Sequence, residues 1–161
     1  MKTIKFSAII FTIILINSCV PLKEVTVVKN DNIARYKYVF ITPTNSVTSS
    51  QTTVSEEKHS TTTKSINPSD VITGILLKEG FVRLPELKPE LLDETLIVNY
   101  GESGRRSTGL GGGYTIEVTI QLISAKSHNL ISSCTAEGQG KTEADDIRIA
   151  ITRCLSSILS E

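Results

Sequence analysis

The amino terminus differs from the rest of the chain and limits how much sequence remains for a folded domain. Lys2 and Lys5 precede an apolar run over residues 6–16, FSAIIFTIILI, and no acid occurs before Cys19. Eleven helical residues rise about 17 Å, whereas the hydrocarbon core of a bilayer is about 30 Å thick. The run is therefore too short for a stable span, and its length and charge are typical of an export signal.

A cysteine follows this run in a specific context. The residues Leu15-Ile16-Asn17-Ser18-Cys19 resemble the lipobox of bacterial lipoproteins, with an aliphatic residue three positions before the cysteine and a small residue directly before it. The resemblance implies that the signal peptide, residues 1–18, is removed and that the Cys19 thiol carries a diacylglycerol. Two or three acyl chains give durable attachment, because each buried methylene contributes about 0.8 kcal/mol. The alternatives are an ordinary secretory signal and an uncleaved anchor.

The residue after the cysteine predicts which membrane holds the protein. Val20 follows Cys19, and the sorting rule of enterobacterial lipoproteins retains in the inner membrane mainly those with Asp at this position. We therefore expect a lipid anchor in the outer membrane, at its periplasmic or its surface face. Residues 19–34 are expected to form the anchor and a tether, and residues 35–161 a single domain.

Length and charge exclude several classes of protein. The 161 residues include 17 basic and 17 acidic side chains, and this balance argues against a nucleic-acid partner. The predicted signal holds two of the lysines and no acid, so the mature chain keeps 15 basic and 17 acidic side chains, a net charge of −2. A chain of this length forms one small hydrophobic core.

The pattern of apolar residues predicts the order of elements. Residues Tyr114 to Ile123 alternate between apolar and polar side chains, which indicates a strand with one face in the core. Asn67 and Gly80 bound a helix, as a cap and a terminating residue. The other predicted elements are strands at Tyr36–Ile41, Leu96–Tyr100 and Leu130–Gly138 and a helix at Thr142–Leu159. Together they predict an α+β fold, a small mixed or antiparallel sheet with a carboxyl-terminal meander and two helices on one face.

Residues 42–65 differ from these elements in composition. Ser and Thr make up more than half of this segment, and Val47 and Val54 are its only hydrophobic residues. Such a segment buries too little apolar surface to form an independent unit. We expect a Ser/Thr-rich surface loop, with an extended β-ribbon leaning on the sheet as the alternative.

Two cysteines remain besides Cys19. Cys134 lies on the inward face of a predicted strand, and Cys154 lies on the apolar stripe of the last helix. An exported chain invites a disulfide between them, and the lengths of strand and helix allow the two residues to meet. The usual spacing of about 10 Å between a strand and a helix counts against the bridge, because a disulfide needs Cα atoms within about 7 Å. Free cysteines packed as small apolar side chains are the alternative.

The glycine-rich run over residues 104–113 is the only segment that hints at a ligand site. It matches neither a phosphate-binding loop, which needs Lys after its second glycine, nor a dinucleotide turn, which leads into a helix. Arg105 and Arg106 are expected in water at a flexible hairpin tip. Alternatively, they form a contact loop for an acidic partner, a lipid phosphate or a glycan carboxylate.

No arrangement of residues predicts catalysis. His59 and His128 both fall in polar connections, and neither Cys134 nor Cys154 is expected to be exposed. Catalysis needs a nucleophile and a base that converge, so we expect no catalytic residue, no metal site and no cofactor.

The domain resembles small envelope lipoproteins of unknown function. The resemblance rests on the strand "YKYVFI", a helix ending in "KEGF", the strands "LIVNY" and "TIEVTIQLISAKSHNLISS", and the last amphipathic helix. This order is similar to the fold of the penicillin-binding-protein activator lipoproteins, the curli secretion lipoprotein and the amino-terminal domain of TolB. It implies a non-catalytic binding or assembly module, whose partner is an envelope protein or a second copy. An enzyme acting on envelope polymers and a self-assembling structural subunit are the competing hypotheses.

Overall fold

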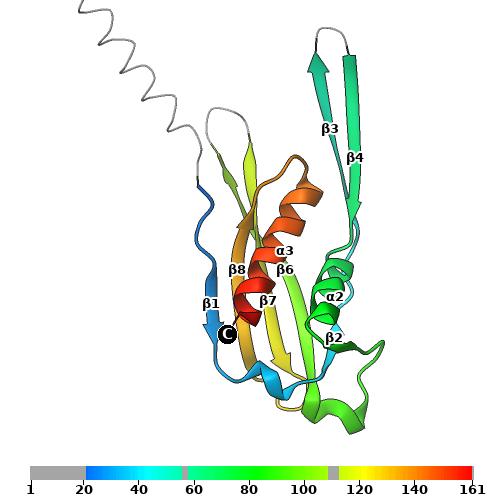
Figure 1. Ribbon diagram of the computed structural model, residues 1–161, viewed down its shortest axis with the longest axis vertical. Helices are drawn as coiled ribbons and strands as arrows, with labels where there is room; N and C mark the ends of the chain where they lie inside the picture. The colour runs from blue at the N-terminus through cyan, green and yellow to red at the C-terminus, as the bar shows by residue number, and fades with distance from the viewer. Residues whose placement is uncertain (1–20, 56–57, 109–112, 161) are drawn as a thin grey trace, which may run out of the picture.

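The computed structural model describes residues 21–55, 58–108 and 113–160, so the predicted signal over residues 1–18 and Cys19 lie outside the described residues. A six-stranded mixed sheet has the order β1-β8-β7-β6-β2-β5, and two helices cover one of its faces (Figure 1). Its strands are β1 (Thr26–Lys29), β2 (Tyr38–Ile41), β5 (Val82–Arg83), β6 (Thr95–Ser107), β7 (Tyr114–Ser124) and β8 (Leu130–Gly138). The helices are α2 (Pro68–Lys78) and α3 (Glu143–Leu159). The predicted α+β class is confirmed.

The predicted meander is formed by β6, β7 and β8, which pair antiparallel in sequence order. Strand β2 pairs parallel with both β6 and β5, because the chain crosses over through α2 and the connection that follows it. The alternation in β7 places four fully buried side chains against the helices: Ile116, Val118, Ile120 and Leu122. Tyr114, which the alternation assigns to this inner face, is 37% exposed at the start of the strand.

Helix α3 closes the core over β7 and β8. The Thr142 side chain accepts a hydrogen bond from the Asp145 N–H and so caps the first turn. The predicted apolar stripe is fully buried and consists of Ile147, Ile151, Cys154, Leu155 and Ile158. Cys154 is joined to Cys134 on β8 by a disulfide with a Cα–Cα distance of 5.6 Å. The helix and the strand are thus linked covalently at the centre of the core.

Helix α2 begins and ends at the residues that the sequence predicts. Asn67 caps the helix by accepting a hydrogen bond from the Ser69 N–H, and Pro68 occupies the first turn. Gly80 ends it with φ +90°, a conformation that favours glycine. The Phe81 N–H then donates to the Leu76 carbonyl at 3.1 Å, which turns the chain back toward β5.

The structure differs from the expected boundary between tether and domain. The sequence pattern predicts a tether over residues 19–34 and a domain that starts at residue 35. Instead, β1 forms an edge of the sheet, with Val27 opposite Cys134, and η1 (Ile33–Arg35), a short 3-10 helix, follows it. Val27 packs against the core, so burial of an apolar side chain draws this segment into the fold.

The Ser/Thr-rich segment is a β-ribbon, not the surface loop expected over residues 42–65. Strands β3 (Val47–Ser55) and β4 (Lys58–Ile66) form a separate two-stranded sheet, which we call the β3–β4 ribbon. It does not lean on the main sheet but projects from the body of the domain (Figure 1). Hydroxyl pairs link the strands on one face: Thr48–Ser65 at 3.2 Å, Ser50–Thr63 at 2.9 Å and Thr52–Thr61 at 3.1 Å. Cross-strand hydrogen bonds therefore support the pairing where apolar contacts are few.

The remaining connections are short. The chain between β5 and β6 contains η2 (Pro89–Glu94), a 3-10 helix. Within the part of the chain that the structure describes, no helix combines the length and the apolar character needed to cross a membrane.

The crossing of β8 and α3 leaves no room for a side chain at Gly138. A Cβ atom there would lie 1.9 Å from the Asp146 carbonyl oxygen and 2.7 Å from the Ala150 nitrogen. Because both contacts are to backbone, Gly138→Ala is expected to lower the free energy of unfolding by at least about 2 kcal/mol. Chemical denaturation monitored by circular dichroism measures the loss.

Gly101 on β6 is the matched control, since a Cβ atom there meets no atom within 4 Å. Gly101→Ala is expected to change stability by less than about 0.5 kcal/mol. Equal stabilities for the two variants would contradict the close approach of α3 to β8.

Candidate functional site

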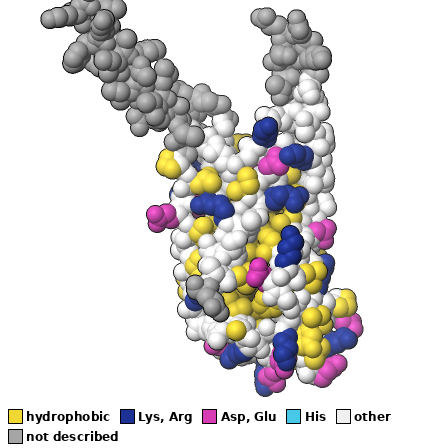
Figure 2. All heavy atoms as spheres, in the orientation of Figure 1, with side chains coloured by type: hydrophobic (Ala, Val, Ile, Leu, Met, Phe, Trp, Pro, Cys, Tyr) yellow, Lys and Arg dark blue, Asp and Glu magenta, His cyan; other side chains and the backbone are white. Residues whose placement is uncertain are grey.

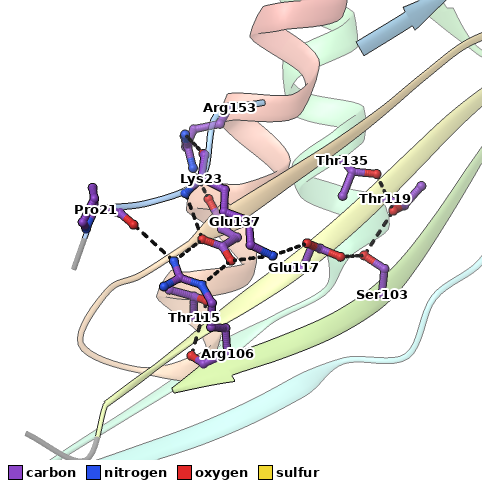
Figure 3. Close-up of polar contacts among 10 residues, drawn as sticks. All are labelled: Pro21, Lys23, Ser103, Arg106, Thr115, Glu117, Thr119, Thr135, Glu137 and Arg153. Atoms are coloured by element: carbon purple, nitrogen blue, oxygen red, sulfur yellow. Dashed lines mark hydrogen bonds and ion pairs between the residues drawn. The ribbon is translucent and has the colours of Figure 1, made fainter. Parts of the chain in front are cut away.

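A polar network lies on the face of the main sheet that the helices leave uncovered. Glu117 on β7 and Glu137 on β8 are directly opposite each other in the strand register, so both side chains point to this face. Thr119 and Thr135 form the next pair, with their hydroxyl oxygens 2.8 Å apart. Figure 3 shows these pairs together with Arg106 from β6 and the segment before β1.

Glu137 is the centre of this network and is only 1% exposed. Arg106 donates to both carboxylate oxygens, from Nε to Oε1 at 2.8 Å and from Nη2 to Oε2 at 2.6 Å. A two-pronged guanidinium contact of this kind is the strongest common pairing for a carboxylate. Arg106 thus compensates the cost of burying the Glu137 charge.

The same carboxylate holds the segment that precedes β1. The Lys23 N–H donates to Glu137 Oε2 at 3.0 Å, and the Lys23 Nζ lies 3.4 Å from Glu137 Oε1. Arg106 also donates to the Pro21 carbonyl at 3.2 Å, and Arg153 on α3 donates to the Lys23 carbonyl at 2.9 Å and to the Glu137 carbonyl. We call these five residues the Glu137 clamp. They bind the chain to the domain from residue 21 onward.

The clamp extends into a second set of contacts across β6 and β7. Lys23 Nζ lies 3.4 Å from Glu117, so one ammonium group bridges both carboxylates. Ser103 donates to Glu117 at 3.0 Å and accepts from Thr119 at 3.1 Å. The register shifts between Glu102 and Gly104, and this bulge includes Ser103.

The surroundings of Glu137 lower its pKa to about 2. Hydrogen bonds from Arg106 are the largest cause, and the Lys23 N–H and ammonium group act in the same direction, while burial opposes them. The Glu137 carboxyl is therefore a permanently charged structural group at neutral pH. A group with so low a pKa is a poor proton donor or acceptor for catalysis near pH 7.

The structure separates the two arginines that the sequence places together. Both lie in β6 and not in a flexible tip, and neighbouring residues of a strand point to opposite faces. Arg105 is exposed, as expected, whereas Arg106 is half-buried. Arg106 joins the Glu137 clamp. Arg105 points to the helix side, where it pairs with Glu143 at the start of α3 and lies 5.3 Å from the centre of the Tyr114 ring. Residues 109–112 of the expected contact loop lie outside the described residues.

A polar hollow of about 500 Å³ lies between the base of the β3–β4 ribbon, the β6–β7 hairpin and the start of α3. The buried Asp146 side chain lines it and accepts a hydrogen bond from the Gly140 N–H. Burial raises the pKa of Asp146, and the carboxylates of Asp145 and Glu143 add to this effect. The Gly140 contact gives the Asp146 side chain a structural part in the turn that leads into α3.

Glu137, Lys23 and Arg153 are site residues that sequence reasoning missed. One signal was available for Glu137, because it is the only charged residue in the otherwise uncharged strand LISSCTAEG. A charge in such a strand needs a partner, but its identity depends on which strands pair. His128 occupies the turn after β7 with φ +58°. Among the described residues, no group of three or more His, Cys, Asp or Glu side chains is arranged to hold a metal ion.

No protein-family model matches the chain, and no curated protein matches it. Several solved structures are similar to it. A PelC variant dodecamer from Paraburkholderia phytofirmans aligns with a TM-score of 0.51 at 16% sequence identity, over 86% of this chain and 98% of that chain. The chain shares the fold of PelC. A second PelC dodecamer from the same organism aligns at 15% identity with a TM-score of 0.48, over the same shares of both chains. At 16% identity the first of these alignments establishes the architecture and no residue roles.

The low pKa of Glu137 predicts how stability depends on pH. Its pKa is about 2 in the folded protein and 4.5 as the ordinary value, so the unfolded chain binds this proton more tightly. The stabilisation is complete above about pH 5 and is lost as the pH falls from 4.5 toward 2. The loss amounts to about 3 kcal/mol, measured as the free energy of unfolding in a pH series.

Glu137→Gln is expected to remove this part of the pH dependence and to lower stability at pH 7, because the partner guanidinium loses its charge compensation. The exposed Glu86, in the connection after β5, provides the control variant Glu86→Gln. An identical slope for the Glu137 variant and the unmodified protein between pH 5 and pH 2 would contradict the role of the clamp.

Proposed function

We propose that this protein is a lipid-anchored module of the cell envelope that acts by binding and assembly and not by catalysis. Cys19 carries the lipid in this proposal, and the outer membrane is its location. The observation that carries the proposal is the Glu137 clamp, which holds residues directly after the predicted anchor. If residues after Cys19 served only as a flexible spacer between the lipid and the domain, no buried carboxylate would be needed to hold them.

The clamp makes many contacts for a segment that lies next to the predicted amino terminus of the mature protein. Terminal residues of a domain are usually poorly ordered unless specific contacts hold them. Here the Pro21 carbonyl, the Lys23 carbonyl and the Lys23 N–H all have charged partners, and β1 follows directly in the sheet. Only Val20 separates Pro21 from Cys19 in the sequence, so a lipid on Cys19 would hold the domain close to the bilayer.

The chemistry of the network favours a structural over a catalytic role. Its carboxylates are engaged by Arg106, Lys23 and Ser103, and Glu137 has a pKa far below the working range of a general acid or base. These contacts support the non-catalytic hypothesis over an enzyme that acts on envelope polymers. The resemblance to other small envelope lipoproteins agrees with this proposal and stays a prediction.

Cys19→Ser tests the anchor directly. The full chain is expressed with its own signal in a Gram-negative host and labelled with a fatty-acid analogue. The unmodified protein should take up the label and sediment with outer membranes. The Cys19→Ser variant should lack the label, because Cys19 is the only cysteine next to the predicted signal. An unlabelled, membrane-free unmodified protein would contradict the proposal.

A self-assembling subunit is the second candidate function. The PelC chain with this fold is a dodecamer. The main sheet of the present chain ends in two short edge strands that carry exposed apolar side chains, Val28 on β1 at 46% exposure and Val82 on β5 at 51%. Contacts between unlike edges of neighbouring copies generate rings or filaments.

A charged residue introduced at one edge of the main sheet tests whether the protein self-assembles. If copies associate through their edges, the detergent-extracted, full-length protein should form multimers in native mass spectrometry, and Val82→Glu should reduce them at least about tenfold, which corresponds to about 1.4 kcal/mol. Gln121→Glu is the control, because Gln121 is exposed on the central strand β7 and not at an edge. A monomeric unmodified protein would exclude self-assembly and leave the lipid-anchored module intact.

A further inference from the structure

We propose that the β3–β4 ribbon lies in the headgroup layer of the membrane that holds Cys19, with its hydroxyl groups bonded to phosphate and glycerol oxygens. The inference rests on the proposed function, since it requires the lipid on Cys19. Its physical basis is the combination of a very short anchor segment and a ribbon that projects from the same end of the domain.

The length of chain outside the described residues limits where the membrane is. Cys19 stands two positions before Pro21, and two extended residues span at most about 7 Å. The Glu137 clamp fixes Pro21 and Lys23 on the domain through Arg106 and Arg153. The membrane surface therefore lies next to the end of the domain at which the described chain begins.

The ribbon projects from this same end. In Figure 1 the start of the chain before β1, the β6–β7 hairpin and the β3–β4 ribbon all point upward, and the ribbon extends past the point where the described chain begins. Strands of nine residues are about 30 Å long, which exceeds the reach of the anchor segment. With the lipid inserted, the ribbon therefore contacts the bilayer surface.

Contacts at the base of the ribbon set its direction relative to the domain. Ser49 on β3 accepts a hydrogen bond from the Ala144 N–H at 3.0 Å, and Lys64 on β4 pairs with Asp145 at 2.7 Å. Both partners belong to the first turn of α3, and the buried Ile66 joins the hydrophobic core. The core, the clamp and the ribbon base thus belong to one connected structure.

The surface of the ribbon suits headgroups and not the hydrocarbon core. Residues 48–52 and 60–65 contain no apolar side chain, and Lys64 is their only charge. Figure 2 shows the ribbon below its grey tip as mostly uncharged and polar, with hydrophobic side chains gathered over the body of the domain. Hydroxyl groups are costly to bury in hydrocarbon but exchange hydrogen bonds with phosphate and glycerol oxygens. The ribbon is therefore expected to lie along the surface without inserting, which requires the long axis of the domain to tilt toward the plane of the membrane.

A fluorescent label at each end of the domain tests this orientation. Ser60 is exposed on β4 toward the ribbon tip, and Glu86 is exposed in the connection between β5 and η2. Full-length, lipidated Ser60→Cys and Glu86→Cys proteins are placed in phosphatidylethanolamine–phosphatidylglycerol vesicles that carry a quencher on the headgroup. Quenching at position 60 should exceed that at position 86 severalfold. It should persist in high salt and in phosphatidylcholine, because hydrogen bonds and not charges hold the ribbon.

The outcomes separate this inference from the proposed function. Equal quenching at both positions in membrane-bound protein, or stronger quenching at position 86, would overturn the orientation and leave the anchor intact. If the label at position 60 is shielded from solvent by other copies of the protein and not by lipid, the ribbon mediates self-association. This result would overturn the inference. Failure of the protein to bind vesicles at all would contradict the proposed function instead.

Variants of the Glu137 clamp provide a second, independent test in the same quenching experiment. Glu137→Gln should keep the protein on the membrane but reduce the difference in quenching between the two positions, because the anchor segment gains freedom to rotate. Lys23→Ala, which spares the Glu137–Arg106 pair, should have a smaller effect in the same direction. Circular dichroism of both variants verifies that the domain is folded, and an unchanged difference in both folded variants would overturn the role of the clamp in orientation.

Discussion

The buried carboxylate of Glu137 is the group on which the arrangement of the chain start depends. A charge that is 1% exposed is stable only when cations and N–H groups surround it. The cations come from two separate parts of the chain, Arg106 from β6 and Lys23 from the segment before β1. Arg153 from α3 donates to the main-chain carbonyl of Glu137 and not to its carboxylate. Compensation of one charge therefore joins the sheet to the first described residues, and the main-chain hydrogen bonds from Arg153 add the last helix.

The domain has two unlike ends. At one end lie the clamp, the base of the β3–β4 ribbon and the start of α3, all held by polar contacts. At the other end the chain turns through η1 and η2, near the carboxyl end of α3 (Figure 1). In the proposed arrangement, a lipid anchor joined to only one of these ends would impose a direction on the domain.

Local signals in the sequence predicted the elements well. The alternation in β7, the Asn67 cap and the Gly80 end of α2 depend on residues within a few positions of each other, so a single stretch contains the information. The stretch Val25–Val28 has the composition of a short strand, but only its pairing with β8 shows that it belongs to the domain. The β3–β4 ribbon was harder to predict, because its Ser and Thr residues favour neither a strand nor a loop through burial.

The site was predicted less well, and the reason is physical. Arg105 and Arg106 follow glycine in a polar run that predicts solvent exposure, and Arg105 is indeed exposed. A strand sends neighbouring side chains to opposite faces, however, so Arg105 pairs with Glu143 and Arg106 with the buried Glu137. The sequence by itself determined the α+β composition and the apolar faces, and it predicts the export signal with its cysteine; all of these are properties of contiguous residues. Only the tertiary structure decided that Cys134 meets Cys154, that Glu137 binds Lys23 and that the ribbon projects beside the chain start, because strand order and helix placement bring together residues far apart in the chain.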